Sequence, residues 1–187
     1  MKARTLIILT ITALALSAAA VAGGYNEIKG TPEADTIIGT AGADRIVSFA
    51  GNDNIDGEAG DDRIYAGAGN DIVRGGAGND LARGGEGNDE LHGGAGNDLV
   101  KGRKGDDVAN GGEGNDRMFG GSGADKLYGG EGNDRLHALA ADKALDLLDC
   151  GAGQDIAWVR AGEEVTIVDC EVVKTVTLTV VSNESDD

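Results

Sequence analysis

The sequence is poor in the residues that build an ordinary hydrophobic core. Its 187 residues include two Phe, three Tyr, one Trp and a single Pro. Gly, in contrast, occurs 33 times, and glycine loses the most backbone freedom on folding while it brings no side chain to bury. We therefore expect a fold without a thick core. Collagen is excluded, because Gly does not recur at every third position and Pro is almost absent.

Positive charge is also scarce. The chain has 16 Lys and Arg against 33 Asp and Glu, which gives a formal net charge of −17. Nucleic acid is therefore not an expected partner, because binding it requires a positively charged surface. The excess of carboxylates points instead to cations as partners, or to solubility.

Long hydrophobic runs are confined to the N-terminus. Lys2 and Arg4 precede an apolar run over residues 6–16, and small residues follow as far as Ala22. This layout is typical of a secretory signal peptide, so we expect residues 1–22 to be cleaved off. The alternative, a membrane anchor, needs roughly 20 apolar residues, and this run is short for that. The mature chain then begins with a short lead-in, residues 23–29, and contains no membrane span.

A repeat of nine residues dominates the rest of the chain. Gly stands two positions before each repeated Asp, except in the first unit, and an apolar residue stands two positions after it. Such a fixed period indicates a repeat architecture. The repeated acids are Asp35, Asp44, Asp53, Asp62, Asp71, Asp80, Asp89, Asp98, Asp107, Asp116, Asp125 and Asp134.

The fullest units, such as residues 75–83, 84–92 and 129–137, read Gly-Gly-x-Gly-x-Asp-x-apolar-x. This pattern resembles the RTX, or haemolysin-type, calcium-binding nonapeptide repeat, and it covers residues 30–137 as twelve units. The resemblance implies an all-β fold, a right-handed parallel β-roll (solenoid) in which two units make one turn. The residues agree with this, because six of each unit suit a Gly-rich loop and three suit a short strand with its apolar side chain inward.

Stacked loops place carboxylates above one another. Asp80 and Asp98 would lie about 5 Å apart on one edge of the roll, near the strand spacing, and would repel each other without a cation. Oxygen ligands in a flexible loop suit Ca²⁺ better than Mg²⁺. Soft metals are disfavoured, because the loops contain no Cys, and we expect His92 and His137 to be solvated on opposite sheets. The alternative is a solvated acidic repeat that binds no metal.

The predicted ligands are Asp carboxylates joined by backbone carbonyls of loops one turn apart, with about ten Ca²⁺ if every pair of loops is filled. We expect weaker binding where loops depart from the pattern, as at Pro32, Glu58 and Arg103. The strong carboxylate candidates are Asp53, Asp62, Asp71, Asp80, Asp89, Asp98, Asp107, Asp116, Asp125 and Asp134, and the weaker ones are Asp35, Asp44 and Asp155. The carbonyl candidates belong to Gly75, Ala77, Gly84, Glu86, Gly93, Ala95, Gly111, Glu113, Gly129 and Glu131.

Residues 138–187 form the predicted C-terminal cap. We expect a loop or short helical turn over 138–146, one further repeat-like unit at 150–158, and an acidic tail at the end. The spacing from Cys150 to Cys170 is close to one turn, so we predict a disulfide between neighbouring rungs of an exported protein. Residues 171–181 alternate Thr with apolar residues, as a half-buried strand does, and we expect that strand to close the open end of the roll.

One face of the roll is predicted to be basic. The even-numbered units expose six permanent cations and no anion, together with Tyr65, Phe119 and His137. Two interpretations remain open: charge balance beside the acidic loops, with Arg stems covering the sheet, or Ca²⁺-dependent docking of an anionic polysaccharide. The cations are Arg45, Arg63, Arg83, Lys101, Arg117 and Arg135.

Motifs of catalysis are missing from the sequence: it contains no His-Glu-x-x-His and no Gly-x-Ser-x-Gly. We therefore expect a binding protein rather than an enzyme. The expected protein is a secreted, extracellular bacterial monomer that folds on binding several Ca²⁺ ions. A structural role, at the cell surface or in the matrix, calcium buffering and polysaccharide binding all remain open.

Overall fold

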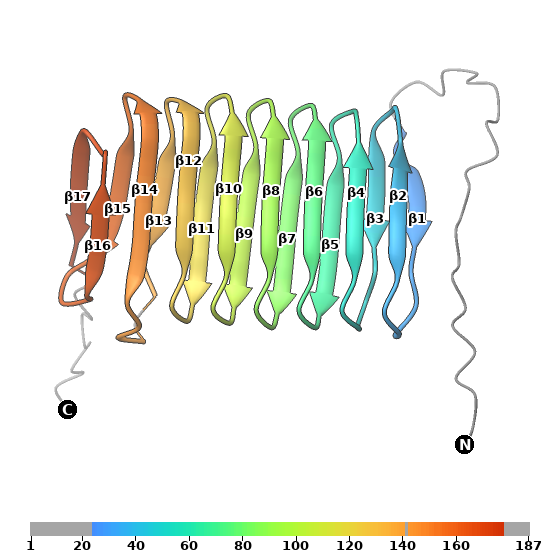
Figure 1. Ribbon diagram of the computed structural model, residues 1–187, viewed down its shortest axis with the longest axis horizontal. Helices are drawn as coiled ribbons and strands as arrows, with labels where there is room; N and C mark the ends of the chain where they lie inside the picture. The colour runs from blue at the N-terminus through green and yellow to red at the C-terminus, as the bar shows by residue number, and fades with distance from the viewer. Residues whose placement is uncertain (1–23, 141, 178–187) are drawn as a thin grey trace, which may run out of the picture.

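The computed structural model describes residues 24–140 and 142–177. The predicted signal peptide and the acidic tail lie outside these residues. The described chain is an all-β solenoid of about eight turns, in which two parallel sheets face each other along the whole length (Figure 1). No helix long and apolar enough to cross a membrane occurs within residues 24–140 and 142–177.

Consecutive strands lie in opposite sheets, so each strand pairs with the strand two places further along the chain. The nine-stranded sheet contains β1 (Asn26–Lys29), β3 (Asp44–Val47), β5 (Arg63–Ala68), β7 (Leu81–Glu86), β9 (Leu99–Lys104), β11 (Arg117–Ser122), β13 (Arg135–Ala138), β15 (Ile156–Arg160) and β17 (Val172–Val176). The eight-stranded sheet contains β2 (Thr36–Thr40), β4 (Asn54–Glu58), β6 (Ile72–Ala77), β8 (Glu90–Ala95), β10 (Val108–Glu113), β12 (Lys126–Gly132), β14 (Asp146–Gly153) and β16 (Val165–Val168).

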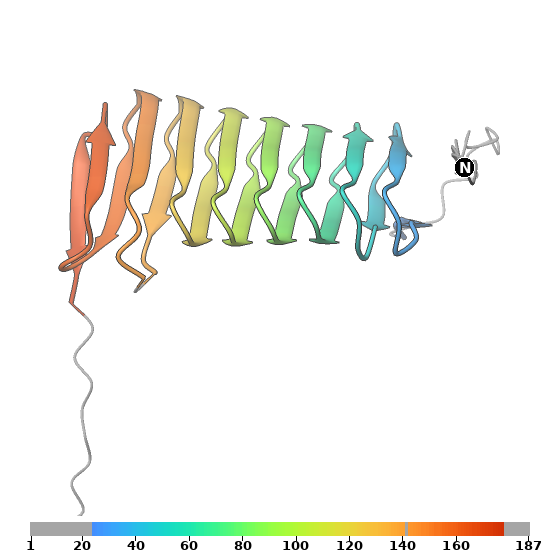
Figure 2. The same ribbon diagram turned by 60° about the horizontal axis from the view of Figure 1, so that its bottom comes forward.

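The register of the sheets shows that two nonapeptide units make one turn. Ile55 pairs with Val73, and Val73 pairs with Leu91, so each core position meets the one that lies two units further along the chain. The turned view shows the same stacking from another side (Figure 2). The predicted parallel solenoid is therefore confirmed.

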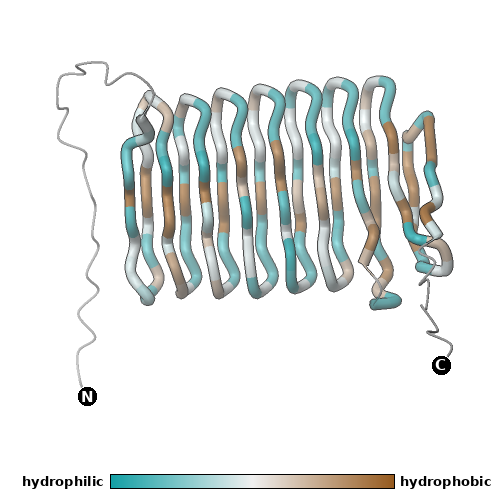
Figure 3. Tube along the Cα trace, turned by 180° about the vertical axis from the view of Figure 1, so that it is seen from behind, coloured by the Kyte–Doolittle hydropathy of each residue, from teal (hydrophilic) through white to brown (hydrophobic). Residues whose placement is uncertain are grey.

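The core is a thin layer of single aliphatic side chains between the two sheets. The residue two positions after each repeated Asp is buried, with an exposed fraction of 5% at Ile37 and 0% at the others. Hydrophobic segments accordingly recur rung after rung along the chain (Figure 3). The core residues of the twelve units are Ile37, Ile46, Ile55, Ile64, Val73, Ala82, Leu91, Val100, Ala109, Met118, Leu127 and Leu136.

The strands are longer than the sequence predicted. In the regular units they span six residues, as in β6, and run through the Gly-Gly pair into the following residue. This is possible because Gly76 pairs with Gly94 in the parallel ladder, with a φ of +111° at Gly76. A side chain at Gly76 would overlap the carbonyl of Glu58 on the preceding turn. The three-residue strand was therefore too short, and the turns are tighter than expected.

The C-terminal strands extend both sheets instead of crossing the end of the solenoid. β15 pairs with β13, and β17 pairs with β15, all in parallel. The expected closing strand is thus the last rung. Its predicted half-burial is wrong for the described part, Val172–Val176, because four of these five residues are exposed and no later described residue covers them. Residues 178–181 of the predicted strand lie outside the described residues.

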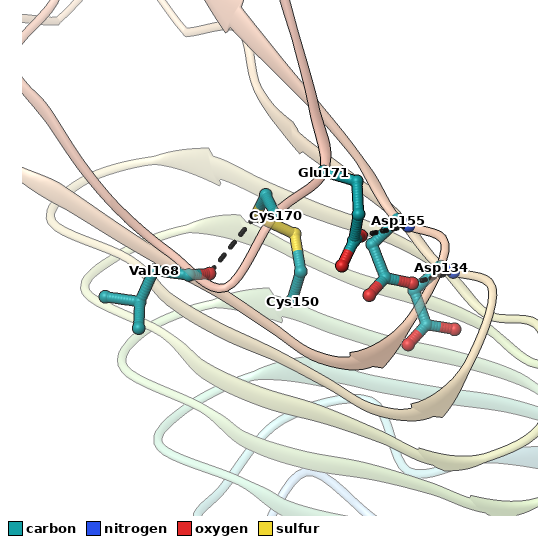
Figure 4. Close-up of a disulfide and its surroundings, with 6 residues drawn as sticks. All are labelled: Asp134, Cys150, Asp155, Val168, Cys170 and Glu171. Carbon is teal, nitrogen blue, oxygen red and sulfur yellow. Dashed lines mark hydrogen bonds between the residues drawn. A yellow bond between two sulfur atoms is a disulfide. The ribbon is translucent and has the colours of Figure 1, made fainter.

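The predicted disulfide is confirmed. Cys150 on β14 is bonded to Cys170, with their Cα atoms 5.1 Å apart (Figure 4). The bond links neighbouring rungs, as the spacing of the two cysteines indicated, because Leu148 and Ile167 pair in the same sheet. Between β13 and β14 the described residues form a loop, which makes this turn longer than those of the regular units.

Candidate metal centre

The repeated Asp residues form two hydrogen-bonded ladders, one at each edge of the solenoid. The backbone N–H of Asp80 donates to Oδ1 of Asp98, with an N···O distance of 2.8 Å, and the same bond recurs from Asp98 to Asp116. On the other edge the N–H of Asp71 donates to Oδ1 of Asp89, at 2.9 Å. Each carboxylate is thereby held against the loop one turn earlier, in the pairs that the repeat period indicated.

The second oxygen of most of these carboxylates has no hydrogen-bond partner within the protein. The side chains are buried, with exposed fractions of at most 3% in the units from Asp53 to Asp134. An unpartnered buried oxygen is costly, and a buried charge costs far more unless it is paired or bound to a metal. The unpartnered Oδ2 atoms belong to Asp53, Asp62, Asp71, Asp80, Asp89, Asp98, Asp107, Asp116, Asp125, Asp134 and Asp155.

Burial raises the pKa of these carboxyl groups. It raises the pKa of Asp98 and of Asp107 to about 7, and neighbouring carboxylates on the same edge contribute to both increases. The pKa of Asp89 rises to about 6, again chiefly through burial. The charged form is therefore disfavoured in the protein alone. Each buried carboxylate therefore requires either a proton or a bound cation.

Gly occupies the first position of most units and leaves room there for this carboxylate oxygen. A Cβ at Gly75 would overlap both Oδ2 of Asp80 and the carbonyl oxygen of Gly93 one turn later. At Gly93 the equivalent atoms are Oδ2 of Asp98 and the carbonyl oxygen of Gly111. A carboxylate oxygen and a backbone carbonyl oxygen therefore converge at these loops, where an added side chain would overlap both. Ser48 and Ala66 replace this Gly in the units of Asp53 and Asp71.

The donor set of these loops consists of oxygen atoms. No group of three or more His, Cys, Asp or Glu side chains suited to a metal occurs in the part of the chain that the structure describes. A site between two loops would therefore combine Asp carboxylates with backbone carbonyls. That combination suits Ca²⁺, which takes six to eight oxygen ligands in flexible geometry.

The candidate carbonyls are of two kinds. Those of Gly93, Gly111 and Gly129 lie beside the glycine Cα one turn earlier, next to the buried carboxylate. Those of Ala77, Glu86, Ala95, Glu113 and Glu131 each accept a backbone N–H from a glycine on the preceding turn. A carbonyl oxygen has two lone pairs, so the second kind retains one for a further contact.

Comparison with known proteins identifies these loops. A protein-family model described as the RTX calcium-binding nonapeptide repeat matches residues 23–48, 29–64, 47–82, 74–109, 83–118 and 110–142, which together cover well over half of the chain. The chain belongs to the RTX calcium-binding repeat family. The search of curated proteins gives no match.

The ladders of this RTX protein continue beyond the residues that the family model matches. The N–H of Asp125 donates to Oδ1 of Asp146, and that of Asp134 donates to Oδ1 of Asp155, at 2.9 and 2.7 Å. Glu171 ends the second ladder by accepting from the N–H of Asp155 (Figure 4). Asp146 and Glu171 were not among the predicted ligands. Asp146 follows Asp125 by the same interval as Asp155 follows Asp134. This shared interval could have identified Asp146 from the sequence.

The first two RTX units differ from the others. Oδ2 of Asp35 accepts the backbone N–H of Thr31, and Oδ2 of Asp44 accepts that of Thr40, both at 2.6 Å. The Thr hydroxyl groups also contact these carboxylates. These two weaker candidates are therefore partnered within their own loops, where the regular units leave Oδ2 without a partner.

Five units carry a larger residue at the position of the second Gly, and in three of these the left-handed backbone conformation is kept. Phe49, Glu58 and Arg103 all keep a positive φ there, of 76°, 73° and 98°. Side chains rarely adopt such angles, which cost about 1–2 kcal/mol per residue. Beside Arg103, Lys104 forms an ion pair with Glu86 one turn earlier, so one of the two cations expected to weaken this loop is already paired.

The two His residues lie on opposite sheets, as the spacing indicated, and share no site. His92 on β8 contacts Glu90, with Nε2 2.9 Å from Oε1. His137 on β13 is not the solvated residue that we expected. Its ring stacks against Phe119 and both ring nitrogens are buried without a partner, because the neighbouring rungs carry aromatic side chains at the same register position.

Proposed function

We propose that this chain is a secreted calcium-binding protein that folds when Ca²⁺ binds between its stacked loops, with a structural role at the cell surface or in the extracellular matrix. The observation that carries the proposal is the row of buried Oδ2 atoms without partners, repeated from Asp53 to Asp134 on both edges. Regular loops present a carboxylate oxygen and a backbone carbonyl to the same space.

Charge explains why folding and metal binding are coupled. The protein has a formal net charge of −17, and much of the excess stands in the two Asp ladders. Without a cation the carboxylates of neighbouring rungs repel one another in a poorly solvated place. A bound divalent ion neutralises this charge and supplies binding free energy, which becomes folding free energy because the site does not exist in the unfolded chain.

Export fits the same chemistry. A disulfide such as Cys150–Cys170 persists in oxidising, extracytoplasmic environments. The N-terminal residues 1–22, with their basic start and apolar run, support a signal peptide. Cytosolic calcium is too low to fill weak sites, whereas extracellular modules bind calcium in the 10⁻⁴–10⁻³ M range. The repeats would therefore stay unfolded until they leave the cell.

Binding, and not catalysis, is the proposed activity. His92 and His137 face opposite sides of the solenoid, on the eight-stranded and the nine-stranded sheet. A nucleophile with a histidine base needs the two side chains within hydrogen-bond reach. His92 instead contacts Glu90, and His137 is packed between aromatic rings.

A second candidate function is the binding of an anionic polysaccharide by the basic face. One observation favours it: aromatic and cationic side chains contact one another on neighbouring rungs of the nine-stranded sheet, as Lys101 and Phe119 do. The folded solenoid is needed to align these side chains, so this binding would depend on calcium.

Two adjacent acids of one loop test the calcium proposal. Asp107 is buried with an unpartnered Oδ2, whereas Asp106 is exposed and its side chain accepts the N–H of Ala124. Asp107→Asn and Asp106→Asn remove the same charge, and Asn already stands at the position of Asp106 in most units. We expect Asp107→Asn to bind fewer calcium ions in equilibrium dialysis, and Asp106→Asn to match the unchanged protein.

The proposal predicts a difference between these two variants that charge alone does not produce. Equal calcium counts for both variants and the unchanged protein would contradict it. Far-ultraviolet circular dichroism of the same samples separates loss of a site from loss of the fold. If Asp107→Asn stays unfolded in calcium while Asp106→Asn folds, the buried carboxylate is still the group on which folding depends.

A further inference from the structure

Aromatic and cationic side chains form one continuous row along the outside of the nine-stranded sheet. Each member follows the core residue of its strand, and neighbours in the row are register partners on adjacent strands. We call these residues the ladder row. In order along the solenoid they are Tyr65, Arg83, Lys101, Phe119, His137, Trp158 and Lys174.

Members of the ladder row contact one another face to face. The rings of Phe119 and His137 stack with centroids 4.3 Å apart, and those of His137 and Trp158 with centroids 5.9 Å apart. Lys101 lies over the Phe119 ring at 5.0 Å, and Lys174 lies over the Trp158 ring at 4.6 Å. The result is a stack of rings with a cation over each end, and this stack presents ring edges to the solvent.

A second row of cations runs beside the ladder row. Arg117 and Arg135 are direct register partners on β11 and β13. From β5 to β17, the two outward rows of the described residues contain no acidic side chain. Two exposed acids occur elsewhere on the described strands of this sheet, and both are paired: Glu27 with Arg45, and Glu86 with Lys104. Glu27 lies on β1, in the lead-in that precedes the repeat units for which a face without anions was predicted.

These features argue against charge balance as the purpose of the face. Like charges on directly opposed residues, such as Arg117 and Arg135, destabilise a sheet. The ring nitrogens of His137 and Nε1 of Trp158 are covered without a hydrogen-bond partner, which also costs free energy. Burial and the two neighbouring Arg residues lower the pKa of His137 to about 4. The arrangement is unfavourable for the protein alone. A bound anion would attract the neighbouring cations and so offset the repulsion between them.

The side chains enclose a hollow at the C-terminal half of this face. It is lined by Arg117, Phe119, Arg135, His137, Ile156, Trp158 and Lys174. Its floor consists of aromatic rings and its rim of three cations. The edges of aromatic rings carry the positive part of the ring quadrupole and so favour the oxygen atoms of a sugar. A carboxylate on that sugar accepts paired N–H bonds from Arg.

We propose that this hollow, together with the ladder row, binds a linear polysaccharide of carboxylated sugars, with sugar oxygens against the ring edges of Phe119 and Trp158 and carboxylates on Arg117, Arg135 and Lys174. The strand order gives the path: the chain of sugars would run along the long axis of the solenoid, across successive rungs. The proposal deepens the second candidate function, and it depends on calcium-coupled folding only in that the face requires a folded solenoid.

The test is a binding titration with a short oligogalacturonate, too short to gel, at a fixed calcium concentration. A neutral oligosaccharide of the same length and a short DNA duplex serve as comparison ligands. The charge variant is the double substitution Arg117→Ser and Arg135→Ser. Its matched control, Arg74→Ser with Lys126→Ser, removes the same charge from exposed positions of the eight-stranded sheet. The aromatic variant Trp158→Ala is matched by Tyr128→Ala on β12.

We expect isothermal titration calorimetry to show binding of the oligogalacturonate and not of the neutral sugar. The charge variant and Trp158→Ala should each weaken binding about tenfold or more, as the loss of charge-assisted hydrogen bonds or of an aromatic contact does. Both control variants should stay within about twofold of the unchanged protein. Circular dichroism and calcium counting on the same samples establish that each variant is folded and loaded.

Several results would overturn the proposal. These are no binding by the folded, unchanged protein, equal losses in the variants and their controls, or equally tight binding of DNA. Self-association that disappears in the charge variant, in the absence of sugar binding, would make the face an interface between copies of this acidic chain. If the protein proved to be folded without calcium, only the calcium proposal would be contradicted. Sugar binding by the variants would still be compared on folded protein.

Discussion

The second Gly of the repeat shows how a single residue determines the shape of a loop. In regular units it has a positive φ, as at Gly121 with +124°, and any side chain would overlap the carbonyl of Arg103 on the preceding turn. Three units keep this backbone conformation with Phe49, Glu58 or Arg103 in place of Gly. The neighbouring rungs therefore impose the conformation, and these residues store strain.

Relieving that strain should stabilise the protein. We predict that Arg103→Gly raises the free energy of unfolding in saturating calcium by about 1 kcal/mol, because the relief of a positive φ outweighs the extra freedom of Gly in the unfolded chain. The mirror change, Gly121→Ala, should destabilise the protein. Urea denaturation followed by circular dichroism measures both. A stability of Arg103→Gly equal to or below that of the unchanged protein would contradict this account.

Single residues also mark what the sequence could predict. The Asp positions and the aliphatic core position follow from the period alone, because each has a fixed place in a stacked loop. The hydrogen-bond partners of Asp35 and Asp44 could not be predicted from the period. Thr31 and Thr40 act through backbone N–H groups, whose direction depends on the local turn. Asp146 and Glu171 were missed because an enlarged loop and the final turn shift the period.

Among the elements, each edge of the solenoid carries two kinds of ladder. The buried Asp side chains point into the space between turns, and exposed Asn side chains form a second ladder outside them. The N–H of Asn97 donates to Oδ1 of Asn79, and that of Asn115 to Oδ1 of Asn97, at 3.0 and 2.9 Å. The Asn ladder needs no ion, whereas the Asp ladder carries buried charge.

The Asp ladders predict opposite effects of pH with and without calcium. Burial raises the pKa of Asp62, Asp107 and Asp125 from 3.8 to about 7 in the folded protein. A group with a raised pKa binds its proton more tightly when folded, so its stabilising contribution is complete below pH 4 and is lost as the pH rises through about 7. The metal-free solenoid should therefore gain β structure when the pH falls from 8 to 5.

With calcium present the same carboxylates lose affinity on acidification, because protons compete for the ligand oxygens. The calcium concentration at half-saturation should rise as the pH falls below 7. Circular dichroism at a series of pH values, in chelator and in calcium, measures both effects. Metal-free protein that loses β structure between pH 8 and 5 would contradict the assignment of these acids as buried carboxylates.

The end of the solenoid was harder to predict than its middle. The alternation of Thr and apolar residues in 171–181 indicates a strand but not its partner, because alternation reports only that one face meets a packed surface. In the structure β17 joins the nine-stranded sheet as its last rung and remains largely exposed. The disulfide was predictable because its spacing is close to one turn.

For the whole molecule, the small number of aromatics and the large number of Gly and Asp residues have one structural explanation. A core one aliphatic side chain thick per rung leaves little room for aromatic rings, and the aromatics instead lie on the outer surface, as Phe119 and Trp158 do. Gly permits close stacking of loops, and Asp occupies the space between them. The folded state consequently depends on neutralising two rows of carboxylates.

The central claim, that calcium binding and folding are one event, is tested most directly by far-ultraviolet circular dichroism during a calcium titration, with magnesium as the comparison ion. We predict little β structure in excess chelator, a cooperative gain of β signal with calcium, and little gain with magnesium at the same concentration. A β signal already complete in chelator near neutral pH, and unchanged by calcium, would contradict the account.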